Sequence, residues 1–311
     1  MPTSATVTGH PDPGAKPSDA GGSRDESEQA FAFVKELAAV VSHGDVELPS
    51  FPAVAMRVCE ILNDEKASTE RIAKVLGAEP ALAARLMRMA NSVALNPLGH
   101  EIRDLKMAVL RVGLDVLRSA AITFAMSQVK LAREYQGLEV PFETLWNRSS
   151  LVASTCYATA RSFMDFRPDE AMLTGLLHGV GRLYILCHAS RYPALSSDSA
   201  MHQQIVRQWS PQIGKAILEN WKMPDAMVAA VEDQDNLDRD TRRPADLTDV
   251  LIVGKLLADR LELPAELPTE TLAAAENLAS LKRLKLVPAA LDRIAETSRH
   301  EIDSLHAALG L

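Results

Sequence analysis

The chain has 311 residues, of which 47% are hydrophobic and only 5% aromatic, enough apolar material for two compact domains or one large domain with a tail. Lys and Arg number 33 against 41 Asp and Glu, so the net charge of -8 opposes attraction to nucleic acid or an anionic membrane. Ala and Leu predominate, and Gly and Pro cluster between apolar stretches, which favours packed helices over sheets. We therefore predict an all-α fold.

Residues 1–27 are rich in Pro, Gly, Ser and Asp, and such a segment cannot bury enough apolar surface to order itself. We predict a flexible tail there. It contains no apolar stretch of signal-peptide length, and nothing in the chain approaches the ~20 apolar residues of a membrane span. Cys59, Cys156 and Cys187 are widely spaced among apolar neighbours, as expected of buried thiols in a reducing compartment. We expect a soluble, cytoplasmic protein.

The segment from residue 28 to residue 130 has the pattern of short helices joined by tight turns. Its apolar spacing predicts helices over residues 28–42, 52–63, 69–76, 80–91 and two more within 102–130. Ser68 is a suitable N-cap for the third of these, and Pro80 stands in the first turn of the fourth, where its missing N–H costs nothing. These helices are expected to form an N-terminal subdomain.

The following segment, residues 141–245, has longer helical stretches. They cover residues 141–163, 168–189 and 210–233. The middle stretch is apolar nearly all round, so we expect it at the centre of a second bundle. Polar residues then form a linker over 233–246, and further helices broken by prolines are expected over residues 246–311.

Five motifs occur in a recognisable order: LPSFPAVAMRVCEILND, EPALAARLMRMANS, IRDLKMAVLRVGLDVLRSAA, LWNRSSLVA and EAMLTGLLHGVGRLYIL. In this order the chain resembles the HDOD domain, a bacterial signalling module related to HD phosphohydrolases that usually lacks their catalytic residues. The resemblance spans roughly residues 46–233. It implies two packed helical subdomains, the second an HD-like bundle, with C-terminal helices packed on one or both. It also implies a role in bacterial regulation, such as motility, biofilm, cyclic-nucleotide or two-component pathways.

The resemblance weakens where a metal would bind. In HD phosphohydrolases a His followed at once by an Asp ligates the metal that activates the attacking water. Here the matching pair is His178 and Gly179, and Arg148 stands where the first ligand His would lie. Glycine offers no ligand and a guanidinium repels a metal. A further His position of the enzymes matches Glu232 and Asp233.

The last carboxylate of the enzyme pattern falls near Lys255 or Asp259, with the register left open. At most two of the usual ligands survive, too few for a hydrolytic metal centre. We therefore predict no enzyme activity, no metal and no cofactor. The chain is expected to act as a non-catalytic signal-transduction module through contacts with signalling proteins, with the groove between the subdomains as the partner or ligand site.

Arg148, His178 and Arg182 are the candidate residues of the vestigial pocket. The favoured interpretation of His178 is a hydrogen-bonded core residue, and that of Arg148 is pairing with an acidic side chain. Arg182 lies one turn beyond His178 on the same helix face, and two arginines could hold a phosphate group. The alternative hypothesis is therefore a residual metal-dependent phosphohydrolase or a sensor for a nucleotide second messenger.

Residues 68–92 also imitate a helix-turn-helix, which makes a transcriptional regulator the third hypothesis. The side chains that would face base edges are Ala81, Ala83 and Ala84. They carry no hydrogen-bonding group with which to read a sequence. Together with the acidic net charge, this argues against DNA as a partner.

Overall fold

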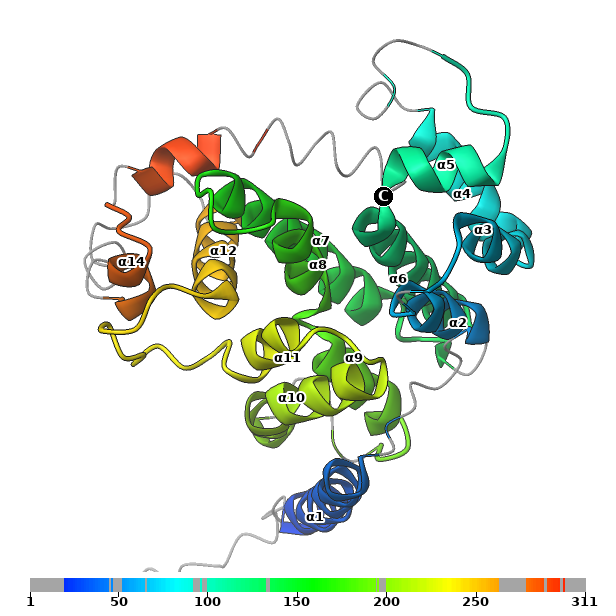
Figure 1. Ribbon diagram of the computed structural model, residues 1–311. Coiled ribbons are helices and arrows are strands. Elements are labelled where there is room, and N and C mark those ends of the chain that lie inside the picture. The colour runs from blue at the N-terminus through cyan, green and yellow to red at the C-terminus, as the bar shows by residue number, and fades with distance from the viewer. Residues whose placement is uncertain are drawn as a thin grey trace, which may run out of the picture.

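The computed structural model describes residues 20–44, 46, 52–64, 66–91, 96, 100–132, 135–193, 195, 200–262, 278–287, 290–296 and 299. Every regular element in these ranges is a helix, which confirms the predicted all-α class (Figure 1). The helices are α1 (Ala20–His43), α2 (Ala53–Leu62), α3 (Thr69–Gly77), α4 (Pro80–Ala90), α5 (Leu105–Val112), α6 (Leu114–Leu131), α7 (Glu139–Arg161), α8 (Pro168–Leu177), α9 (Val180–Ala189), α10 (Ala200–Asn220), α11 (Asp225–Glu232), α12 (Leu247–Glu262) and α14 (Ala279–Arg283). None of the described helices is long and apolar enough to cross a membrane.

Helices α2 to α6 form a first bundle with its own apolar core (Figure 1). Ser68 caps α3 as predicted, because its hydroxyl accepts the backbone N–H of Arg71 at 3.3 Å. Gly113 separates α5 from α6 at a φ of 82°, a conformation that residues with a side chain rarely adopt. The spacing of apolar residues in the sequence therefore predicted helices α2 to α6.

Helices α7 to α12 and α14 form a second bundle around a larger core. Every residue from 171 to 181 is buried, which confirms the predicted central position of this stretch. The stretch is nevertheless two helices rather than one, because the chain turns at His178 and Gly179. On either side of that turn, Gly175 lets α8 approach the backbone of Ala153 in α7, and Gly181 lets α9 approach the carbonyl of Ser210 in α10.

Helix α1 belongs with the second bundle by its contacts, although the sequence-based division begins the first subdomain at residue 28. The ring of Phe33 lies 5.0 Å from that of Tyr192, and the Tyr192 hydroxyl donates to Glu36 at 2.7 Å. The helix also begins at Ala20, inside the tail expected over 1–27. Residues 1–19 of that tail, and 263–277 and 300–311 of the C-terminal segment, lie outside the described residues.

Asn63 joins the two bundles. Its side-chain N–H donates to the Lys222 carbonyl at 2.7 Å, and its Oδ1 accepts from the guanidinium of Arg118 at 2.8 Å. Arg118 is only 8% exposed, while Lys222 adopts a φ of 51° in the turn between α10 and α11. A single polar side chain therefore bridges a buried cation of one bundle and a left-handed turn of the other.

Candidate functional site

His178 lies in the turn between α8 and α9 and is only 4% exposed. Its Nδ1 is 2.6 Å from the carbonyl oxygen of Gly175, and because a carbonyl only accepts, Nδ1 carries the hydrogen. Burial chiefly lowers the pKa of His178, opposed by that hydrogen bond, and the charges of Lys255, Arg182 and Arg148 take it to about 3. The side chain is a neutral, hydrogen-bonded core histidine, as the sequence predicted.

Lys255 of α12 brings an ammonium group close to this turn. It donates to Asp235 Oδ1 at 2.5 Å and to Gln234 Oε1 at 3.1 Å. Gln234 in turn donates to the His178 carbonyl at 3.1 Å. The side chain of Lys255 is 16% exposed, and burial lowers its pKa against the opposing effect of Asp235. Through Gln234, α12 thus brings a cation rather than a carboxylate toward His178, while the match of Lys255 or Asp259 to the last ligand position stays a prediction.

Arg148 of α7 is paired with acidic side chains, as predicted. Its guanidinium donates to Asp259 Oδ1 at 2.6 Å and to Glu262 Oε2 at 2.9 Å, and it also reaches the Lys255 carbonyl at 3.3 Å. The arginine side chain is 18% exposed. Asp259, the other candidate for the last ligand position, is therefore held by Arg148 rather than directed at His178.

The position next to His178 has little room for a carboxylate. A Cβ atom built on Gly179 would lie 3.1 Å from Ser149 Oγ and 3.2 Å from Leu145 Cδ1, both on α7. Both distances are tighter than ordinary van der Waals contact. A side chain here would therefore require Ser149 and Leu145 to shift by a few tenths of an ångström, which glycine avoids.

Arg182 is the third cation near His178. It is half-buried in the first turn of α9, and its charge acts on His178 and on Lys255. Within the described ranges it makes no hydrogen bond and no ion pair. Arg148 and Lys255 are thus neutralised by carboxylates, whereas Arg182 is not.

This donor set does not suit a divalent metal. Metal centres of HD phosphohydrolases need neutral histidines and carboxylates that converge, but here one histidine is surrounded by three cations. No three His, Cys, Asp or Glu side chains converge among the described residues. Glu232 is also engaged elsewhere, since it pairs with Lys215 at 2.9 Å.

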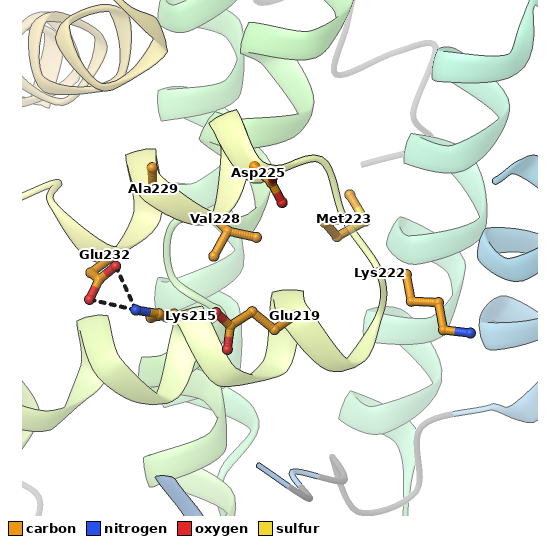
Figure 2. Close-up of a pocket in the computed structure, with 8 residues that line it drawn as sticks. All are labelled: Lys215, Glu219, Lys222, Met223, Asp225, Val228, Ala229 and Glu232. Carbon is orange, nitrogen blue, oxygen red and sulfur yellow. Dashed lines mark hydrogen bonds and ion pairs between the residues drawn. The ribbon is translucent and has the colours of Figure 1, made fainter. Parts of the chain in front are cut away.

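A cavity of about 520 Å³ lies between α10 and α11 (Figure 2). The Lys215–Glu232 pair closes one side of it, and Met223 and Val228 supply apolar lining. In Figure 2 the side chain of Lys222 points away from the cavity, toward the first bundle. The cavity therefore lies in the second bundle beside the Asn63 bridge. The groove between the subdomains stays a prediction as the partner or ligand site.

The chain belongs to the HDOD domain family. The family's model matches residues 48–237, which is more than half of the chain. This range contains all five motifs, including the turn that carries His178. The chain is thereby a relative of the HD phosphohydrolases. None of the curated proteins compared with the sequence matches it.

Solved structures of bacterial proteins share the fold. A candidate metal-dependent phosphohydrolase from Shewanella amazonensis SB2B is 23% identical, with a TM-score of 0.66 over 92% of this chain and 99% of that one. An HDOD domain protein of unknown function from Geobacter sulfurreducens is 20% identical, with a TM-score of 0.55 over 91% and 98%. A candidate signal transduction protein from Marinobacter aquaeolei VT8 is 19% identical, with a TM-score of 0.62 over 92% of this chain and 65% of that one.

Proposed function

We propose that this protein is a non-catalytic regulatory module of the bacterial cytoplasm that transmits a signal through contacts with other signalling proteins. One observation carries the proposal: Lys255 and Arg148 hold positive charge beside His178, where an HD phosphohydrolase would hold its metal. The name of the Marinobacter relative is consistent with this role. Motility, biofilm, cyclic-nucleotide and two-component pathways are the settings in which we would look for partners.

The fixed cations would take over the structural work of a metal. A bound metal draws together the helices that supply its ligands. Here Arg148 ties α7 to α12 through Asp259 and Glu262, and Lys255 ties α12 to the segment after α11 through Asp235. Ion pairs need no metal uptake, so such a module would keep its shape whatever the metal supply.

Metal analysis together with a hydrolysis assay tests the proposal. Protein purified without chelator should carry only background levels of transition metal, and it should not hydrolyse phosphomonoesters or cyclic dinucleotides in the presence of Mn²⁺. Hydrolysis that copurifies with the protein and is lost in His178→Ala would refute a non-catalytic role. His202→Ala, a buried histidine on α10, is the matched control for loss of a core imidazole.

Arg182 supports a second candidate function, the binding of a nucleotide second messenger. A half-buried guanidinium without a counter-charge among the described residues is suited to a phosphate group. Calorimetry with a cyclic dinucleotide and with guanosine tetraphosphate should then show heat that disappears in Arg182→Ala. Arg242→Ala, which removes an exposed arginine paired with Asp240, should leave it unchanged. Absence of heat from the wild-type protein at high concentration would exclude this site.

A further inference from the structure

Large apolar side chains remain exposed along one face of α5 and the start of α6. Met107 is 48% exposed, Leu110 59% and Leu114 48%. Met107 and Leu110 are three residues apart and lie on one side of α5, and Leu114 is the first residue of α6, directly after Gly113. Exposed apolar groups that gather in this way mark contact surfaces more often than isolated ones do.

This apolar face lies in a basic part of the chain. Residues 66–131 contain ten Lys and Arg against five Asp and Glu, whereas the rest of the sequence contains 23 against 36. Arg111, next to Leu110, is exposed and forms no hydrogen bond or ion pair with any described residue. The α5 face therefore suits a segment that offers an apolar anchor flanked by negative charge.

The outer face of α1 has that chemistry. Phe31 is 74% exposed, although Phe33 on the other side of the same helix is fully buried. Glu28 and Asp25, which lie one and two turns before Phe31, are both exposed as well. An aromatic side chain with a carboxylate one turn before it on the same helix face complements an apolar patch beside an arginine.

Figure 1 places α1 and α5 at opposite ends of the molecule, so the two faces do not meet within one chain. We propose that α1 of one copy packs on α5 of a second copy, with Phe31 against Leu110 and Glu28 opposite Arg111. A two-fold dimer would contain this contact twice, once in each direction. The inference goes beyond the regulatory role proposed above and does not depend on it.

A nucleic acid fits the α5 face less well than a protein helix does. Phosphate groups would satisfy Arg111, but they would leave Met107, Leu110 and Leu114 facing a charged backbone. A protein helix buries the apolar side chains and pairs the arginine at the same time. Because of its exposed apolar side chains, the α5 face suits a protein helix better than a nucleic acid.

Sedimentation equilibrium of the full chain between about 5 and 500 µM tests the proposal. An interface of this small size predicts self-association with a Kd on the order of 10–100 µM. Phe31→Ser and Leu110→Ser should each raise the Kd about tenfold or more, as expected for a central anchor. Met164→Ser, which removes a side chain that is 103% exposed elsewhere, is the matched control and should leave the Kd unchanged.

Charge exchange supplies the sharper test. Glu28→Lys and Arg111→Glu should each weaken self-association, because each brings like charges together. An equimolar mixture of the two variants should associate again, since one contact then joins Lys to Glu and the other keeps the native pair. A wild-type protein that stays monomeric up to about 500 µM, or an association indifferent to Phe31 and Leu110, would overturn the proposal. Circular dichroism confirms that each variant is folded.

Discussion

The two bundles differ in whether their buried Lys and Arg side chains are paired with carboxylates. In the second bundle Arg148, Lys255 and Arg239 are each paired with carboxylates. In the first bundle Arg85 and Arg118 have buried nitrogen atoms without a hydrogen-bond partner among the described residues. Burial lowers the pKa of Arg85, and the neighbouring Arg88 adds to the effect. The second bundle thus pairs its buried cations with carboxylates, whereas the two buried arginines of the first bundle have no carboxylate partner among the described residues.

The largest expected effect comes from breaking the most buried pair of the second bundle. Asp249 is fully buried between Arg239, at 2.8 Å, and Arg283, at 3.3 Å. Asp249→Ala would leave two buried guanidinium groups short of a counter-charge, so we expect a loss of about 3–5 kcal/mol in the free energy of unfolding. Urea denaturation at pH 7 measures it.

Asp240 provides the control for that experiment. It also pairs with an arginine, Arg242, but that arginine side chain is 89% exposed. Asp240→Ala should therefore leave the free energy of unfolding nearly unchanged. Equal losses in Asp240→Ala and Asp249→Ala would show that burial of the pair does not govern its contribution.

Lys255→Met should lower the free energy of unfolding by about 1–3 kcal/mol. The buried side-chain oxygen of Gln234 would lose the hydrogen bond that Lys255 donates to it. Lys215→Met is the matched control, since it breaks the Lys215–Glu232 pair, whose side chains are 34% and 31% exposed. Unfolding in urea should separate the two variants. If Lys255→Met proved as stable as the wild type, the ammonium group would have no structural role in place of a metal.

The Asn63 bridge determines how firmly the two bundles are coupled. Asn63→Ala would remove both the hydrogen bond to the Lys222 carbonyl and a partner of the buried Arg118, at a cost of about 1–2 kcal/mol. We expect amide hydrogen exchange to accelerate in the turn around Lys222. Asn236→Ala, an exposed asparagine after α11, should change neither quantity. Unaltered exchange at Lys222 would mean that other contacts hold the bundles together.

The sequence predicted the helices of the fold better than it predicted the ion pairs between them. Apolar periodicity and capping residues such as Ser68 are local signals, so they placed the helices of the first bundle correctly. The single helix expected over 210–233 was wrong, since the structure has α10 (Ala200–Asn220) and α11 (Asp225–Glu232) there. The turn at His178 and Gly179 and the docking of α1 through Phe33 were missed, because both depend on side chains that are distant in sequence. Tertiary contacts override local propensity at such positions.

The candidate site shows the same limit. Sequence comparison singled out His178, and the chemistry of a buried guanidinium predicted a carboxylate partner for Arg148. It did not identify Asp259 and Glu262, which lie 111 and 114 residues further along the chain. One usable signal was present, since Lys255, Asp259 and Glu262 follow one another at intervals of four and three and therefore share a face of α12. No comparable spacing in the sequence indicated that Gln234 and Asp235 contact Lys255.

The effect most specific to the site is the pH dependence that His178 confers, which is absent at neutral pH and develops only in acid. Its pKa is about 3 in the folded chain against 6.5 for a free side chain, so the unfolded chain binds the extra proton more readily. The stability contribution is complete above pH 6.5 and is lost as the pH falls toward 3, with a slope of up to about 1.4 kcal/mol per pH unit. His178→Gln should flatten the dependence of unfolding free energy on pH between 6.5 and 5, while His43→Gln, an exposed histidine, should not. If His178→Gln left the slope of unfolding free energy against pH unchanged, water would reach the imidazole and the pocket would be open. An open pocket would favour ligand binding beside Arg182 over a sealed structural site.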